Sequence, residues 1–158
     1  MSREVFSTYL NDHLAGSVAA LELVDHLRAA AEGTPLEQLF VALRSEIEED
    51  QEVLRTLLRQ RGGTESKIRK AAAWLTEKLG EAKLKLDDTG TGELELLEAL
   101  ETLGLGIQGK LGLWHALEAA EVPELRGLDL ARLKQRAVDQ HGRIEAERLR
   151  VARRALSG

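Results

Sequence analysis

The sequence predicts an all-α protein, a bundle of long amphipathic helices, and two observations support this. Apolar residues recur three and four positions apart through most of the chain, which is the spacing of one face of an α-helix. The chain is also rich in the strong helix formers Leu, Ala, Glu and Arg and contains two prolines. With 158 residues, 43% of them hydrophobic, it can bury one core. We therefore expect residues 1–158 to form a single helical-bundle domain.

The first two predicted helices are separated by a short turn. The first runs over about residues 3–32 and ends at Gly33. The second has the clearest start signal in the chain, because Thr34-Pro35-Leu36-Glu37 matches a capping box with proline at the first helical position. It ends at the glycine pair 62–63. These two helices are expected to form an antiparallel hairpin.

Three further helices are predicted in the remainder of the chain. A short one covers about residues 65–79, and the composition of residues 87–92 predicts a loop. Longer helices cover about residues 93–121 and the stretch from the N-cap Asp129 to the end. The four long helices have about 26 to 30 residues each, or roughly 40–45 Å. Two antiparallel hairpins with a short additional helix in the crossover between them are the one-crossover topology of ferritin-like four-helix bundles. A plain five-helix up-and-down bundle is the alternative.

Four stretches of the chain resemble small bacterial ferritin-like proteins of no assigned function. They are residues 10–17 (LNDHLAGS), 46–50 (EIEED), 72–80 (AAWLTEKLG) and 109–114 (GKLGLW). Together they touch all but the last helix. The resemblance implies a ferritin-like fold, and it raises the question of a metal site.

Di-iron ferritin-like proteins use a carboxylate from each of two helices and a Glu-x-x-His from each of the other two. Residues three apart lie on one helical face, so both can reach the bundle axis. This sequence contains no Glu-x-x-His, and the nearest approach to it is Glu22 with His26. A standard di-iron site therefore does not match the chain.

Polar residues nevertheless continue the apolar stripes near the middle of the predicted bundle. They are His13, Ser17, Glu46, Asp50, Gln108, Gln140 and His141. Buried carboxylates are costly unless they are paired. One solution is an iron or manganese ion, for which the candidate ligands are His13, Glu46, Asp50 and His141, with Glu101 or Glu145 as additional carboxylates.

The other solution is a hydrogen-bonded, ion-paired network that includes Arg136 or Arg143 and fixes the register of the helices. These groups could also simply point to solvent. An inward cluster of unpaired carboxylates would favour metal, whereas an inward Arg or Lys paired with Glu46 and Asp50 would favour a structural network.

Four glycines interrupt the strong helical pattern of residues 93–121. They are Gly104, Gly106, Gly109 and Gly112, and each costs about 1 kcal/mol against alanine in a helix interior. We expect the close approach of another backbone to offset this cost, for example the face formed by residues 71–73. A kink or a π-bulge is the alternative. If the glycines face outward, they could admit a second subunit.

Several classes of function find no support in the sequence. The chain has no cysteine, which excludes disulfides, thiol nucleophiles and cysteine metal sites. It shows no Gly-x-Ser-x-Gly and no phosphate-binding loop. Residues 127–158 carry eight basic and four acidic groups, but they lack an aromatic stacking platform. Because cations are favoured at a helix C-terminus, we interpret the basic end structurally and expect no nucleic-acid partner.

Neither a secretory signal nor an apolar run of roughly 18 residues is visible, so we expect a cytoplasmic protein without a transmembrane segment. The leading hypothesis is a non-enzymatic structural or interaction protein that binds an unknown protein partner or self-associates, for example as a homodimer, and needs no cofactor. The alternative is a divergent ferritin-like protein that binds iron or manganese through the carboxylate and histidine candidates named above.

Overall fold

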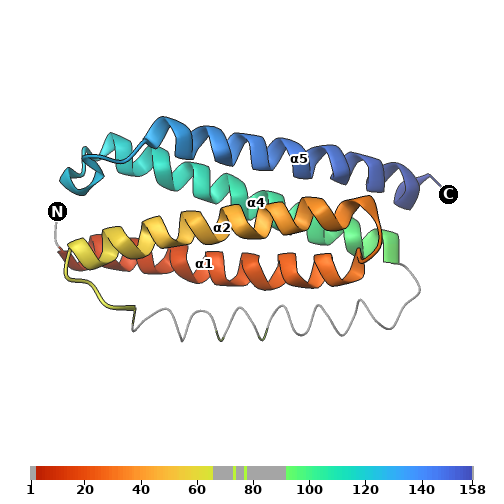
Figure 1. Cartoon of the computed structure of the whole chain (residues 1–158), viewed down its shortest axis with the longest axis horizontal. Helices are drawn as coiled ribbons and strands as arrows, with labels where there is room; N and C mark the ends of the chain where they lie inside the picture. The colour runs from red at the N-terminus through yellow and green to blue at the C-terminus, as the bar shows by residue number, and fades with distance from the viewer. Residues whose placement is uncertain (1–2, 66–72, 74–76, 78–91, 158) are drawn as a thin grey trace.

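The computed structural model describes residues 3–65, 73, 77 and 92–157, and Figure 1 shows them as a bundle of long helices. The long helices are α1 (Arg3–Ala30), α2 (Pro35–Gln60), α4 (Gly92–Ala119) and α5 (Leu130–Leu156), with a short 3₁₀ helix, η2 (Pro123–Leu125), between α4 and α5. No strand occurs in this part of the chain. The prediction of an all-α protein with four long helices is confirmed.

The four long helices pack as two hairpins. α1 pairs with α2, α4 pairs with α5, and α1 also packs against α4. In Figure 1, α2 runs back to the end of the bundle where α1 begins, whereas α4 begins at the opposite end. The predicted short helix over about residues 65–79 lies outside the described residues, apart from Ala73 and Glu77, which are helical.

The turn between α1 and α2 lies where the sequence places it, but its hydrogen bonds differ from the predicted capping box. Gly33 has a φ of 76°, a left-handed conformation that favours glycine. The Thr34 hydroxyl donates to the Ala31 carbonyl oxygen at 2.7 Å and does not cap α2. The Glu37 carboxylate accepts from the Gly33 N–H at 3.0 Å. The predicted bonds of the capping box are therefore wrong, because the hydroxyl turns back to a carbonyl at the end of α1, and Pro35 remains as the start signal.

The connection between α4 and α5 closes one end of the bundle. Asp129 caps α5 as predicted, because its carboxylate accepts from the Arg132 N–H at 3.0 Å. Arg61, which follows α2, donates to the carboxylate of Glu124 in η2 at 3.0 Å. The same guanidinium lies over the ring of Phe6, 4.8 Å from its centre. These contacts join the start of α1, the end of α2 and η2.

The apolar core consists of two clusters at opposite ends of the bundle. One cluster contains Val24, Phe40, Leu43, Leu100, Leu103, Ile144 and Val151, and the other contains Phe6, Leu10, Leu14, Leu57, Leu58, Leu113 and Trp114. All of these side chains are nearly inaccessible to solvent. Polar side chains from α1, α2, α4 and α5 lie between the two clusters, at the middle of the bundle. The fold thus places a polar layer inside an otherwise apolar core.

The middle of α4 carries few charges. Between Glu101 and Glu118 its single charged side chain is Lys110. Among its inner glycines Gly104 is buried, and a Cβ there would lie 3.9 Å from Ile144 of α5. This is an ordinary contact with a side chain, so the close approach of another backbone that we expected is not seen at the glycines of α4 among the described residues, and residues 71–72 lie outside them. Despite its apolar character, α4 could not cross a membrane, and neither could any other helix in the described part of the chain.

A substitution at Gly112 tests whether the surface of α4 is open at this position. At Gly112, no described atom lies within 4 Å of an added Cβ, and the residue is exposed. We expect Gly112→Ala to raise the free energy of unfolding by up to about 1 kcal/mol, because alanine favours the helix. Gly33→Ala, at a positive φ, should lower it by about 1 kcal/mol. Urea denaturation measures both. A destabilising Gly112→Ala would contradict an open α4 surface.

Candidate functional site

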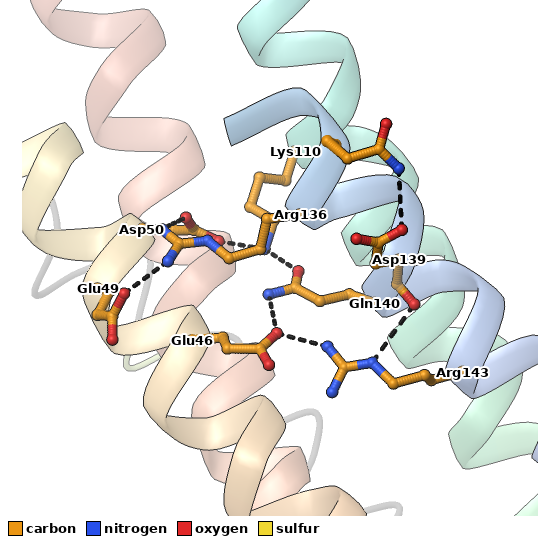
Figure 2. Close-up of polar contacts among 9 residues, drawn as sticks. Glu46, Glu49, Asp50, Lys110, Arg136, Asp139, Gln140 and Arg143 are labelled. Atoms are coloured by element: carbon orange, nitrogen blue, oxygen red, sulfur yellow. Dashed lines mark hydrogen bonds and ion pairs between the residues drawn. The ribbon is translucent and has the colours of Figure 1, made fainter. Parts of the chain in front are cut away.

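The polar layer is built by helical spacing on α2 and α5. On α2, Glu46 and Asp50 are four residues apart, so both lie on the side that faces α5. On α5, Arg136, Gln140 and Arg143 recur four and three apart and point back towards α2 (Figure 2). α4 contributes Lys110 to the same layer.

Asp50 lies at the centre of the layer, with 2% of its surface exposed. Lys110 donates from Nζ to its Oδ2 at 2.6 Å, and Arg136 donates from Nη2 to its Oδ1. Each carboxylate oxygen therefore accepts a charge-assisted hydrogen bond. Two cations from two different helices hold this one buried anion.

Gln140 connects Lys110, which binds Asp50, to Glu46, the second carboxylate of the layer. Its side chain is fully buried. Its Oε1 accepts from Lys110 Nζ, and its Nε2 donates to Glu46 Oε2 at 2.9 Å. Arg143 donates from Nη2 to the same Glu46 oxygen at 2.5 Å. Figure 2 shows the resulting chain of contacts, which runs across α4, α5 and α2.

The charges of the layer balance. Arg136 also donates from Nη1 to Glu49 at 2.5 Å, near the surface. Three carboxylates, on Glu46, Glu49 and Asp50, thus meet the cations of Lys110, Arg136 and Arg143. A buried charge is tolerated when it is paired and hydrogen-bonded, so a balanced network can remain in the interior.

The pKa values of the layer follow from burial and from these partners. Burial alone would raise the pKa of Glu46, but the hydrogen bonds from Arg143 and Gln140 outweigh it and hold the pKa below its usual value. Burial lowers the pKa of Lys110, although the charge and hydrogen bond of Asp50 oppose this shift. The ionised form of Glu46 is therefore the one that the network stabilises.

A second polar contact joins α1 to α2 at the same level. Gln51, which is 5% exposed, donates from Nε2 to Ser17 Oγ at 2.9 Å. The Ser17 hydroxyl in turn donates to the Leu14 carbonyl oxygen at 2.6 Å. Every long helix thus contributes a polar side chain to the middle of the bundle.

The six predicted metal ligands do not form a metal-binding group among the described residues. Glu46 and Asp50 lie inward and close together, as the spacing predicts, but cations occupy their oxygens. Glu101 and Glu145 both pair with Arg148. Within residues 3–65 and 92–157, no group of three or more His, Cys, Asp and Glu side chains is arranged to hold a metal ion.

The two histidine candidates belong to different parts of the bundle. His13 is half-buried on α1, with its ring 4.8 Å from that of Tyr9 in an edge-on arrangement. Burial lowers the pKa of His13, partly opposed by Asp12. His141 lies on α5 beside Gly104 of α4. Neither histidine is among the hydrogen-bond partners of Glu46 or Asp50.

Sequence reasoning identified Arg136, Arg143 and Gln140 as partners in a network but missed Lys110. A signal for it was present, because Lys110 follows the buried Ile107 by three residues and is the single charge between Glu101 and Glu118. A charged residue on the inward face of an uncharged helix stretch indicates a buried ionic partner.

Three of the four arginines near the end of α5 are also paired. Arg148 donates to Glu145 at 2.7 Å, Arg150 pairs with Glu147, and Arg154 donates to Glu93 of α4 at 3.0 Å. These ion pairs lie at the surface, where each contributes little to stability. They spread the basic charge over acidic neighbours, in line with the structural interpretation of the basic end.

The buried ion pair makes a prediction about stability. We expect Asp50→Asn to lower the free energy of unfolding by about 3–5 kcal/mol, because Lys110 and Arg136 lose the anion that compensates their burial. Glu49→Gln is the matched control, since Glu49 bonds the same arginine but is exposed, and it should change stability little. Denaturant unfolding measures both. The double variant Asp50→Leu, Lys110→Met should recover part of the loss, and equal effects of Asp50→Asn and Glu49→Gln would contradict this account.

The lowered pKa of Glu46 predicts a dependence on acid. A carboxyl group with a depressed folded-state pKa stabilises the fold above its unfolded value of 4.5, and the contribution disappears as pH falls through the folded value. We therefore expect Glu46→Gln to be less stable than the wild type at pH 7, with the difference shrinking below about pH 4.5. Thermal unfolding between pH 7 and pH 3 measures it. A difference that grows on acidification would show that the sign is wrong.

Comparison with known proteins adds no family to this geometry. No protein-family model matches the chain, and no curated protein or solved structure matches it. The resemblance to ferritin-like proteins therefore stays a prediction, and the function has to be argued from the residues themselves.

Proposed function

We propose that this chain is a non-enzymatic structural or interaction protein, a helical bundle of ferritin-like connectivity in which the polar layer fixes how the two hairpins pair. One observation carries the proposal: Asp50, the most deeply buried carboxylate of the layer, is held by Lys110 and Arg136. A metal site would need these oxygens free. In this structure the two cations bind both oxygens of Asp50 instead.

The network is suited to setting register. Arg136 and Arg143 of α5 reach across to α2, and Lys110 of α4 meets both helices through Asp50 and Gln140. A shift of one hairpin along the other by a single helical turn would separate these charges and leave them buried without partners, at a cost of several kcal/mol. Apolar side chains alone would discriminate less between such shifts, because one apolar contact can replace another after the shift.

The ferritin-like part of the proposal is supported by the directions of the helices. α2 ends at one end of the bundle and α4 begins at the other (Figure 1), which is the arrangement that a single crossover between the two hairpins requires. Ferritin-like bundles are built in this way. The proposed partner is a second copy of the chain or another protein. Light scattering on the purified protein tests whether the chain self-associates.

Metal analysis tests the proposal directly. We expect the wild type, expressed in medium supplemented with iron and manganese, to be folded and to contain far less than one metal ion per chain, because the mid-bundle carboxylates are already paired. Elemental analysis measures the metal, and circular dichroism measures the fold. The double variant Glu46→Ala, Asp50→Ala is the control. Near-stoichiometric metal in the wild type that disappears in this variant would overturn the proposal in favour of a metalloprotein.

A further inference from the structure

The α4/α5 hairpin, whose two helices lie side by side in the bundle (Figure 1), carries most of the exposed apolar side chains. Seven large hydrophobic side chains are exposed among the described residues, and five of them belong to these two helices. They are Leu94 and Leu105 of α4 and Val138, Leu149 and Leu156 of α5. Leu105 is the most exposed, at 74%. Exposed apolar residues that gather on one part of a surface indicate an interaction site.

An ion-pair bridge shows that α4 and α5 present these residues on the same outer side. Arg148 of α5 bonds both Glu145 of its own helix and Glu101 of α4, at the surface. Leu105 follows Glu101 by four residues, so it lies one turn further along the same face of α4. Leu149 follows Glu145 by four residues on α5 in the same way. The two apolar stripes therefore flank one seam between the helices, and we call this surface the outer face of the hairpin.

Glycines form hollows beside the exposed apolar side chains. Gly109 of α4 and Gly142 of α5 are exposed, and no described atom lies within 4 Å of a Cβ built on either of them. Glycine destabilises a helix interior relative to alanine, and contacts within the described part of the chain do not account for these two. A face that combines protruding side chains with hollows can pack against a second face of the same shape.

The register of the hairpin brings one protrusion level with one hollow. A Cβ built on Gly104 of α4 would lie 3.9 Å from both His141 and Ile144 of α5. Because the two helices run antiparallel, the next residue of α4, Leu105, lies level with Gly142, which is between those two contacts. The same count places Val138 of α5, four residues before Gly142, level with Gly109 of α4, four residues after Leu105.

The charges of the two helices are opposite. α4 has five glutamates and one lysine, a net charge of −4, whereas α5 has eight basic and three acidic residues, a net charge of +5. When two outer faces meet about a twofold axis parallel to the helices, α4 of each copy lies over α5 of the other. A twofold axis across the helices would instead place α4 over α4 and α5 over α5. Electrostatic complementarity favours the parallel axis.

The parallel axis also matches the shapes. In this arrangement Leu105 of each copy lies over Gly142 of the other. Val138 of each copy likewise lies over Gly109 of the other. The same patch then serves on both subunits, as a twofold interface requires.

The area of the outer face is sufficient for a stable dimer. α4 and α5 have 28 and 27 residues, so each is roughly 40 Å long, and two helices side by side are roughly 20 Å wide. Their common face therefore covers roughly 800 Å², which is about the area that each partner buries in a standard protein interface.

From these observations we infer that the outer face of the α4/α5 hairpin binds a second copy of this chain, with α4 of each copy packed over α5 of the other. The inference rests on the proposed interaction role and names its partner and its surface. The two can fail separately. A metal-free monomer would overturn the dimer and leave the role of the polar layer standing, whereas bound metal that depends on Glu46 and Asp50 would overturn that role.

Sedimentation equilibrium of the full chain tests the dimer. We expect the wild type to sediment as two chains of 17.4 kDa, with a dissociation constant below about 10 μM. Leu105→Lys should weaken the dimer by at least about tenfold, because it brings a cation against the basic α5 of the other copy. Val41→Lys is the matched control, since Val41 is also exposed but lies on α2, and it should leave the constant within about twofold. Circular dichroism checks that both variants fold. A monomeric wild type at 100 μM (roughly ten times the expected constant), or equal effects of the two variants, would overturn the inference.

Cysteine cross-linking tests the arrangement, and the natural chain has no cysteine to interfere. The single variants Leu105→Cys and Gly142→Cys are mixed in equal amounts, unfolded and refolded together, and then oxidised. We expect the disulfide between the two different variants to dominate, because positions 105 and 142 face each other across the twofold axis and disulfides need closely placed Cα atoms. Mass spectrometry distinguishes the three possible dimers. A predominance of disulfides between identical variants, or no disulfide at all, would overturn the packing of α4 over α5.

Discussion

Burying the carboxylate of Asp50 in the middle of a four-helix bundle requires cations on the neighbouring helices, and this requirement organises the rest of the structure. Desolvation of the ion costs several kcal/mol, so each of its oxygens must be bonded. Lys110 and Arg136 meet this need from α4 and α5. Burying the two cations without Asp50 would also cost free energy. The arrangement of α2, α4 and α5 that pairs all three charges is therefore favoured over others.

The same requirement accounts for how the helices are spaced. α2 and α5 meet through long side chains, Glu46, Arg136 and Arg143, which bridge between the backbones. α1 packs directly against α4. The polar layer divides the apolar core into two clusters, each of which closes one end of the bundle.

Most of the fold could be predicted from the sequence, because the hydrogen bonds of a helix join residues that are close in the sequence. The periodicity of apolar residues and the turn at Gly33 and Pro35 gave the limits of α1 and α2 within a few residues. The inward positions of Glu46 and Asp50 followed from the same periodicity. The hydrogen bond of Thr34 could not be predicted in this way, because the same sequence pattern allows its hydroxyl to donate to a carbonyl oxygen or to accept from an N–H.

What the sequence could not settle was the identity of the partners of the inward carboxylates. Glu46 and Asp50 have the same spacing whether they bind a metal or a cation, since both uses need two carboxylates on one face of a helix. The difference lies in side chains on other helices, far away in the chain: Lys110 is 60 residues from Asp50, and Arg136 is 86. Long flexible side chains reach such positions only in the folded bundle. A ferritin-like pattern of buried carboxylates thus becomes evidence for metal only after the cations within reach of it have been counted, and here three of them meet three carboxylates.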